Sequence, residues 1–598
     1  MSDRALPASV SAIALETAAQ ATPARLSADA IGRAGEAGAL AQLTAAMAEL
    51  KAMSVRPLLQ RAVDALQAEQ IGPAFEWVRQ ALERDEHSGF GWYLMGIVQE
   101  RRGDFSSSIL AYEAALKLLP EQAEVANDLG RLAYRMGLKP QAEKLFRHFL
   151  RQYPGHGEAL NNLACALRDQ RRFDEAIETL RPAIEAEPGS ALLWNTMGTI
   201  VAEQGDYPNS EIFLTEALNL DPAFLKARYN LGNVRLALGD AASALECCDL
   251  ALASVVAEDE RQMMRLSRST ILMALGRLGE GWDEYEARLD PQFADATHFM
   301  FNRPRWTPGA DLEGKSLLVC AEQGLGDEVL FANVLPDVIQ RLGPSGRLTL
   351  AVEPRLVELF RRSFPSARVF AHATHNVGGH TVRHIPAFQE ELHTVDLWAP
   401  MGSLLREFRR QVADFPTGGG YILPDPARVA HWKQVLDEQA PPGPKIGLLW
   451  KSLVTNNARH RFFSPFDGWK PILRVEGACF VNLQYGDCTE ELAAAERDLG
   501  VRIWNPPGID LKQDLDEIAA LSAALDLVIG FANATLNIAA AGGAPTWLIV
   551  SPGAWPVLGQ DRYLWYPSAR LFPAKAFGDW SPVMERVADD LTDHLKTL

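Results

Sequence analysis

The feature that most constrains this chain is a period of 34 residues that runs through its first half. Prolines recur at that spacing, at Pro120, Pro154, Pro188 and Pro222. Small residues keep the same phase in two series, one at Gly96, Gly130, Ala164, Gly198 and Gly232, the other at Ser108, Ala142, Ala176, Ser210 and Ala244. Small side chains allow two helices to touch, and a unit of this length has room for one helix pair. The period therefore predicts helix pairs that bury their apolar faces by stacking on their neighbours.

Two further series keep this phase. Large side chains lie at Tyr112, Phe146, Leu180 and Leu214, and turn glycines at Gly103, Gly137, Gly205 and Gly239. The combined pattern resembles the tetratricopeptide repeat, and we predict such an array over residues 56–290. The resemblance implies a superhelix whose concave groove binds an extended peptide or a helix; the alternative is a spacer or a dimerisation arm. Residues 1–36 are predicted to be flexible, and residues 37–55 to form a capping or partner-binding helix.

After a proline-marked linker at 291–312, the pattern changes to alternating strands and helices. The stretch Val319–Leu330 reads as the end of a buried strand, a glycine turn and the start of a helix, with Asp327 at the helix start. An aspartate at that place is either an N-terminal cap or a functional group. We predict two α/β halves, 313–420 and 421–598, joined by a flexible Thr417–Gly420 segment. Strands are expected at 316–320, 347–352, 368–371, 446–450, 479–485, 527–529 and 547–550, and helices at 327–342, 354–364, 515–525 and 533–542.

Composition excludes several classes of protein. The formal net charge is −18 and the pI is near 5.2, which argues against nucleic acid or an anionic membrane as the main partner. No apolar run approaches the length of a membrane span, and the N-terminus lacks the pattern of a signal peptide. The six cysteines form neither a metal-binding nor a disulfide pattern. We therefore expect a cytoplasmic protein.

Several motifs after residue 276 occur in a family order: Gly276–Leu289, C-A-E-Q-G-L-G-D-E at 320–328, G-L-L-W-K-S at 447–452, R-H-R-F-F-S-P-F-D-G-W at 459–469, F-V-N-L-Q-Y-G-D at 480–487 and W-Y-P-S-A-R at 565–570. Together with the repeats, they resemble bacterial fusions of tetratricopeptide repeats to a heptosyltransferase-like GT-B glycosyltransferase domain. The resemblance covers roughly residues 56–598. It implies an α-helical repeat array followed by a two-lobed GT-B domain, with the acceptor on the first lobe and a nucleotide sugar on the second.

The subgroup that these motifs resemble most includes flagellin glycosyltransferases, which use nonulosonic acids such as pseudaminic acid. The resemblance implies an inverting, metal-independent transfer from a nucleotide-sugar co-substrate to Ser or Thr of flagellin bound by the repeats. Two alternatives stay open: a non-catalytic repeat adaptor with a relic transferase domain, and a heptosyltransferase-like enzyme of polysaccharide assembly.

The candidate site residues follow from the chemistry and the motifs. Asp327 is the candidate catalytic base, because its Gly-Asp context matches the family's catalytic aspartate. It lies on an acceptor-side loop with Glu322, Gln323, Gly324 and Gly326. Donor-phosphate ligands are expected at Lys451, Arg459, Arg461, Asn533, Thr535 and Asn537, since cations and helix starts stabilise a leaving phosphate. Tyr485 and Asp487 are expected to contact the nucleotide.

One motif departs from the family pattern. Heptosyltransferase-like domains carry Val-Asp-Thr-x-x-x-His in the last βα turn, whereas this chain has Phe531-Ala-Asn-Ala-Thr-Leu-Asn537. Ala532 replaces the sugar-binding Asp and Asn537 replaces the His. These changes argue against a heptose donor and, beside basic residues, favour a donor with its own negative charge, such as a CMP-linked nonulosonate.

Overall fold

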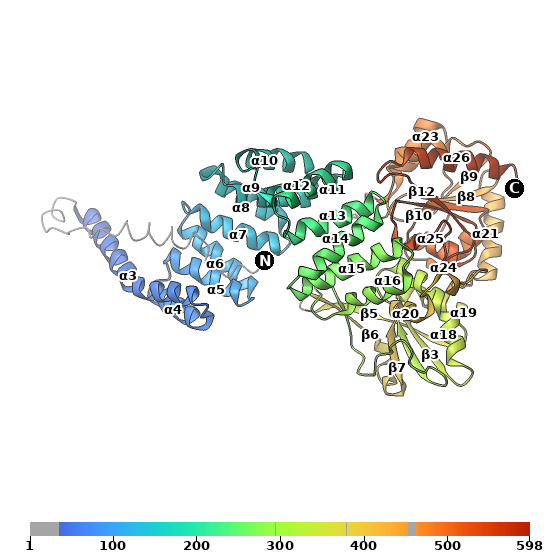
Figure 1. Ribbon diagram of the computed structural model, residues 1–598, viewed down its shortest axis with the longest axis horizontal. Coiled ribbons are helices and arrows are strands. Elements are labelled where there is room, and N and C mark those ends of the chain that lie inside the picture. Colours follow the sequence, from blue (N-terminus) through green and yellow to red (C-terminus); the bar gives the residue numbers. More distant parts are fainter. Residues whose placement is uncertain (1–34, 294, 378, 453–461, 598) are drawn as a thin grey trace. The chain divides into compact units, whose positions relative to one another are not determined.

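A computed structural model describes residues 35–293, 295–377, 379–452 and 462–597. The chain forms two compact units, residues 1–200 and 201–598 (Figure 1). The predicted flexible segment lies almost wholly outside the described residues, as do Arg459 and Arg461. No helix in the described ranges is long and apolar enough to cross a membrane.

The first unit is a helical repeat array, as the sequence predicts. Its first helix, α3 (Gly35–Gln67), continues through the expected boundary at residue 55 and contains Pro57. This helix pairs with α4 (Ile71–Arg84), and the pairs that follow are α5 (Gly89–Arg101) with α6 (Phe105–Leu118), α7 (Ala123–Arg135) with α8 (Lys139–Gln152), and α9 (Gly157–Asp169) with α10 (Phe173–Ala186). The next helix, α11 (Ala191–Gln204), has its last turn in the second unit.

The periodic small residues are where helices touch. A Cβ at Gly96 would lie 2.6 Å from the Tyr112 ring, and one at Gly130 would lie 2.8 Å from the Phe146 ring. Tyr112 and Phe146 are almost fully buried. Tyr112 and Phe146 therefore fill the space that a missing side chain leaves on the preceding helix, which explains why the small and the large series keep the same phase.

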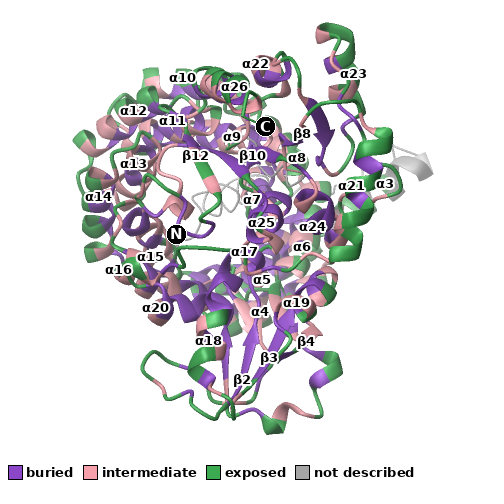
Figure 2. Cartoon of the chain, turned by 90° about the vertical axis from the view of Figure 1, so that its right-hand side faces the viewer, coloured by how far each residue is buried: buried purple, intermediate pink, exposed green. Residues whose placement is uncertain are grey.

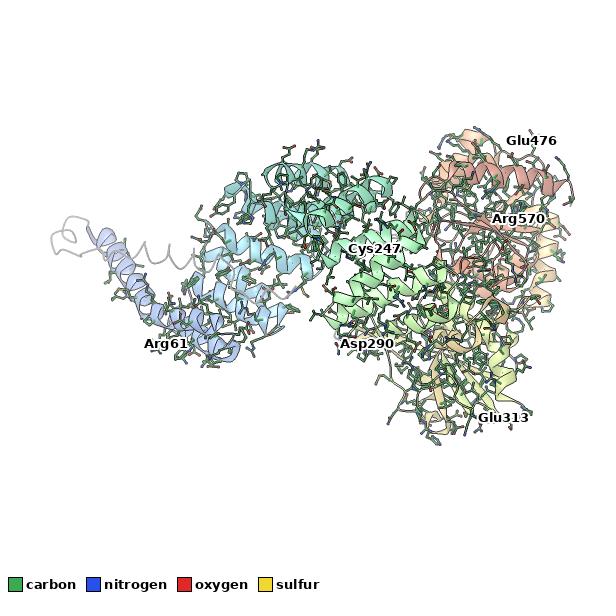
Figure 3. The ribbon with its side chains drawn as sticks, in the orientation of Figure 1. Arg61, Cys247, Asp290, Glu313, Glu476 and Arg570 are labelled. Carbon is green, nitrogen blue, oxygen red and sulfur yellow. The ribbon has the colours of Figure 1, made fainter. Side chains whose placement is uncertain are left out.

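Repeat helices continue into the second unit. They are α12 (Tyr207–Leu220), α13 (Leu225–Ala237), α14 (Ala241–Ser254), α15 (Glu258–Ala274), α16 (Leu278–Tyr285) and the 3-10 turn η1 (Glu286–Leu289). Figure 3 labels Asp290, directly after this turn, and Glu313, just before the strand β2 (Ser316–Cys320). In the linker between them, Trp306 is buried and its backbone N–H donates to the Trp398 carbonyl at 2.7 Å.

The first α/β portion contains a parallel sheet in the order β4-β3-β2-β7. Its strands are β2 (Ser316–Cys320), β3 (Arg347–Val352), β4 (Ala367–Ala371) and β7 (Leu397–Pro400). The helix expected over 327–342 is divided into α17 (Leu325–Phe331) and α18 (Leu335–Leu342), because Pro336 has no N–H for the hydrogen bond that would continue one helix. The chain then forms α19 (Val357–Ser363).

A smaller sheet of order β1-β6-β5 is formed by β1 (Thr297–Phe299), β5 (Ala373–Val377) and β6 (His380–His384). The sequence patterns did not predict these short strands, whose residues are largely polar and partly exposed.

The second α/β portion contains a parallel sheet in the order β12-β11-β10-β8-β9. Its strands are β8 (Lys445–Leu449), β9 (Cys479–Asn482), β10 (Leu527–Phe531), β11 (Thr546–Val550) and β12 (Ala569–Pro573). Its helices include α21 (Pro426–Gln439), α23 (Thr489–Leu499), α24 (Leu515–Ala523), α25 (Ala534–Ala541) and α26 (Ser581–Leu595). The inner strands of both large sheets are buried almost throughout, whereas the edge strands β4 and β12 are partly exposed (Figure 2).

The two large sheets and the end of the repeats share one hydrophobic core. Trp282 of α16, Leu335 of α18 and Leu536 of α25 belong to the same cluster of buried side chains. The joint expected to be flexible is packed at its end: a Cβ at Gly420 would collide with the Ala541 carbonyl and lie 2.8 Å from the Gly543 nitrogen. The last glycine of this joint thus packs closely against the backbone at the end of α25, so this end of the joint is not a free hinge.

Candidate functional site

The turn between β2 and α17 holds Asp327 in a defined position. Gly324 is the N-cap of α17, and its backbone N–H donates to Asp327 Oδ2 at 3.1 Å. The Asp327 N–H donates in return to the Gly324 carbonyl at 2.9 Å. Asp327 is half-buried. The capping role expected of an aspartate at this place is therefore present, and it fixes the direction of the carboxylate.

The same turn contains a conformation that only its surroundings can stabilise. Gln323 has a φ of +63°, in the left-handed region that non-glycine residues rarely adopt. Its carbonyl accepts a hydrogen bond of 3.1 Å from Arg383 Nη2, and Arg383 Nη1 donates to the carbonyl of Ala321. Arg383 lies in β6 and is buried. The small sheet thus supplies an arginine whose guanidinium binds two backbone carbonyls of the turn.

Glu322 is not an exposed member of an acceptor loop. It is 1% exposed, and its carboxylate forms a bidentate ion pair with Arg288 of η1, at 3.0 Å and 2.6 Å. It also accepts the backbone N–H of Gly402 at 2.9 Å. The sequence analysis placed Glu322 on the acceptor-side loop, but both oxygens of its carboxylate are already used within the protein.

Tyrosine side chains from two other segments lie near Asp327. Burial first, and then the Asp327 charge, raise the pKa of Tyr563 above its ordinary value. Burial and neighbouring charges that include Asp327 also raise the pKa of Tyr285 and Tyr566. These phenols therefore stay protonated at neutral pH.

The start of α25 meets the Asp327 turn, although the two are far apart in sequence. Asn537 Nδ2 donates to the Gly326 carbonyl at 2.9 Å. A Cβ at Gly326 would lie 3.2 Å from Asn537 Nδ2 and 3.4 Å from the Ala534 nitrogen, so a larger residue would require these neighbours to shift by a few tenths of an ångström. Asn533 is the N-cap of α25 and accepts the Leu536 N–H at 3.0 Å. The structure thus brings together the predicted residues Gly326, Asn533 and Asn537.

Polar atoms at this meeting point have unused hydrogen-bonding capacity. Asn533 Nδ2 and Asn537 Oδ1 are buried, and neither has a hydrogen-bond partner within the described ranges. Thr535, between them in sequence, is 2% exposed. Most buried polar groups are paired, so two unpaired amide atoms on adjacent turns of one helix are typical of a ligand site.

Lys451, which is predicted to bind the phosphate of the nucleotide sugar, lies after β8 and contacts the segment that follows β9. Lys451 Nζ donates to the Asp487 carbonyl at 2.8 Å and forms an ion pair with Glu491 of α23. The backbone N–H groups of Trp450 and Lys451 both donate to Gln484 Oε1, at 3.0 Å and 2.8 Å. The Lys451 ammonium is therefore held against α23 rather than free at the end of β8.

The two residues predicted to contact a nucleotide lie in the same loop. Tyr485 is half-buried, and its carbonyl accepts Gln484 Nε2 at 2.9 Å. Asp487 is exposed and accepts the Thr489 N–H at 3.1 Å. The Thr489 backbone N–H and hydroxyl hold the pKa of Asp487 below its ordinary value. Asp487 is thus ionised at neutral pH, and it lies two residues before the start of α23.

Sheet topology places these loops where open α/β sheets bind ligands. In an open α/β sheet, ligands bind at the carboxyl ends of the strands, where the strand order reverses. In the second sheet that point lies between β8 and β10, which precede Lys451 and Asn533. In the first sheet it lies between β2 and β7, which precede Asp327 and Gly402.

Arg288 and Arg383 were missed by sequence reasoning. Arg288 lies within the Gly276–Leu289 motif, but nothing in the local pattern shows that its partner lies 34 residues later. Arg383 lies in a short, irregular strand and contacts backbone carbonyls, which leave no trace in the sequence.

Comparisons with known proteins identify the repeats and one full-length relative. A tetratricopeptide repeat family model matches residues 93–157 and 161–223. The BBSome complex member bbs-4 of Caenorhabditis elegans is 28% identical over 138 residues, covering 23% of this chain and 30% of that protein. Among solved structures, a tetratricopeptide repeat protein from Parabacteroides merdae has a TM-score of 0.36 and 16% identity, and covers 39% of this chain and 93% of its own.

Protein FlbA of Caulobacter vibrioides is 48% identical over 566 residues, which cover 95% of this chain and 94% of FlbA. The two chains match over the repeats and over both α/β portions. This chain belongs to the family of protein FlbA.

Proposed function

We propose that this protein is a GT-B glycosyltransferase that transfers a sugar from a nucleotide donor to Ser or Thr of a protein held by its repeats. The observation that carries the proposal is the meeting of the Asp327 turn with the start of α25. It supports a site in which a carboxylate from one parallel sheet region opposes a helix start from the other. Such a pair offers a base to an acceptor hydroxyl and N–H groups to a leaving phosphate.

The acceptor that we propose is flagellin, on the basis of the motif resemblance. The test compares the intact mass of flagellin from cells with the gene, without it, and with the gene restored. We expect flagellin from the deletion strain to be lighter by a whole number of sugar residues, and restoration to recover the mass. An unchanged flagellin mass would exclude this acceptor. Restoration by an Asp327→Asn gene would favour the alternative of a non-catalytic adaptor.

The repeats supply polar groups suited to an extended peptide. Asn127, Asn161 and Asn195 occupy equivalent positions, 34 residues apart, in the first helices of successive repeats. Asn127 Oδ1 and Asn161 Oδ1 are buried and have no hydrogen-bond partner in the part of the chain that the structure describes. The backbone of a peptide offers donors along its whole length, so the open amide oxygens of Asn127 and Asn161 support recognition that is independent of the peptide's side chains.

We expect the double variant Asn127→Ala/Asn161→Ala to bind flagellin roughly 5- to 150-fold more weakly. Each lost hydrogen bond is worth about 0.5–1.5 kcal/mol, and about 1.4 kcal/mol is a factor of ten. Stability should change little, because the open oxygens have no partner to lose. Calorimetric titration with flagellin measures the effect. The control is Asn219→Ala on α12, whose exposed amide donates to Glu216; unchanged affinity in the double variant would exclude this row from acceptor binding.

For the donor we propose a CMP-linked nonulosonate, a sugar that carries its own carboxylate. Ala532 is exposed directly before Asn533, where the related heptosyltransferases have an acidic residue. We expect Ala532→Asp to weaken binding of such a donor at least ~10-fold, because two like charges would be juxtaposed. CMP alone, which lacks the sugar carboxylate, and the neutral variant Ala532→Asn are the controls. Equal loss for CMP and for the sugar nucleotide would place the effect on the nucleotide rather than on the sugar.

A further inference from the structure

The last turn of the repeat helices carries a fully engaged arginine. Arg288 in η1 has a side chain that is 2% exposed. Its guanidinium donates to both oxygens of Glu322, to the Tyr285 carbonyl at 2.9 Å, to Glu286 Oε1 at 3.1 Å and to Ser403 Oγ at 3.1 Å. Its planar group also lies 4.1 Å from the centre of the Tyr285 ring. These hydrogen bonds use all three nitrogens of the planar guanidinium, an arrangement that a lysine ammonium cannot reproduce.

The partners of Arg288 belong to the two strand ends where the first sheet changes direction. Glu322 follows β2, and Gly402 and Ser403 follow β7. The Glu322 carboxylate accepts the Gly402 N–H, and a Cβ at Gly402 would lie 2.8 Å from Glu322 Oε1 and 3.1 Å from Arg288 Nη2. Doubly wound sheets bind ligands at this crevice. Here the repeat array fills part of it.

Glu322 is also the first residue of the turn that ends at Asp327. The next residue, Gln323, is in the left-handed conformation, and the residue after it donates its N–H to Asp327. A strained residue keeps its conformation only when the groups around it determine it. Two buried arginines do so here: Arg383 holds the Gln323 carbonyl, and Arg288 holds the side chain of Glu322.

We propose that Arg288 is a positioning residue for Asp327, so that the last turn of the repeat array completes the transfer site. The inference rests on the proposed function, in which Asp327 is the base. Arg288 touches neither substrate in this scheme. It sets the place of Glu322, and thereby the path of the five residues that lead to the Asp327 carboxylate.

The experiment separates positioning from simple stabilisation in the full-length protein. Arg288→Met and Glu322→Gln each leave a buried group without its partner, and both should lower the melting temperature and kcat. The double variant Arg288→Met/Glu322→Gln leaves no unpaired charge, and its amide can still accept the Gly402 N–H. Removing both members of a buried ion pair often costs little stability. We therefore expect its melting temperature to return towards that of the wild type.

Its kcat, in contrast, should stay at least ~10-fold low, because a displacement of about 1 Å at a reacting group can cost about 100-fold. KM for flagellin and the affinity for the nucleotide should change little. Hydrogen exchange in residues 321–327 should be faster than in the wild type. Recovery of both stability and kcat in the double variant would show that Arg288 only stabilises the fold and would overturn the inference.

Arg288→Lys is the second variant, should the double variant fail to fold. It keeps the positive charge but loses the planar guanidinium that binds both oxygens of Glu322, so we expect a reduced kcat with an unchanged KM for flagellin. A wild-type kcat would overturn the inference. A wild-type protein that transfers no sugar would refute the proposed function and this inference with it. Normal transfer by the wild type and by Arg288→Lys would refute the inference alone.

Discussion

Asp327→Asn should transfer sugar at least ~100-fold more slowly than the wild type while it folds and binds both substrates normally. A hydroxyl becomes a good nucleophile only when a base takes its proton in the transition state, and a positioned base is worth about 10²- to 10⁴-fold. Asparagine has the same size, and its Oδ1 can still accept the Gly324 N–H that Asp327 accepts at 3.1 Å. It cannot take a proton at neutral pH. Single-turnover rates with saturating donor and acceptor measure the effect.

The matched control is Asp414→Asn. Asp414 occupies the same position in a short helix, where its Oδ2 accepts the Gln411 N–H at 2.9 Å. It has the same capping role away from the proposed base, so transfer should be unaffected. A transfer rate for Asp327→Asn equal to that of this control would show that Asp327 only caps the helix and is not the base.

The neighbouring Glu328 is unsuitable as a control. It is 1% exposed, accepts the Glu353 N–H at 2.8 Å and lies 3.0 Å from His372 Nε2. Its replacement would leave buried groups unpaired and would disturb the fold.

Trp282→Ala should lower the free energy of unfolding of the second unit by about 3–5 kcal/mol, the cost of a large cavity in a core. Trp282 is fully buried, and its indole N–H donates to the Arg409 carbonyl at 2.8 Å. Its ring lies 6.3 Å and 6.1 Å from the rings of Trp555 and Trp565. The side chain therefore joins the repeats to both α/β portions. Urea unfolding followed by circular dichroism measures the loss.

Trp282→Phe keeps an aromatic ring but loses the hydrogen bond and part of the volume, and we expect a smaller loss of about 1–3 kcal/mol. A loss below ~1 kcal/mol for Trp282→Ala would mean that the cluster relaxes around the cavity. The repeats and the sheets would then be less tightly joined than the packing indicates.

The fold was predictable where one local pattern determines each element. Strands β2 and β3 match their expected ranges because continuous apolar runs mark buried parallel strands. The strand β7 was missed because it has only four residues and ends in a proline, and β12 because Arg570 interrupts its apolar residues. The repeats were predictable because their signal recurs many times.

The candidate site was predictable only in part, for a physical reason. Gly326, Asn533 and Asn537 were expected from glycine turns and helix starts, and the structure brings them together. The partner of each side chain, however, is chosen by tertiary packing. Glu322 pairs with Arg288, and Lys451 with Glu491, because distant segments happen to meet there. No spacing rule relates these residues.

The shared core at the end of the repeats has a consequence for how this family can diversify. Trp282 and Arg288 tie the last helices to the sheets, whereas the repeats before residue 200 form a separate compact unit. In a repeat array each unit contacts only its neighbours. Duplication, loss or exchange of the early repeats therefore leaves these tying residues unchanged. If the repeats recruit the acceptor as proposed, recombination of the chain upstream of residue 200 would change which acceptor is recruited, whereas a crossover near residue 290 would cut through the core.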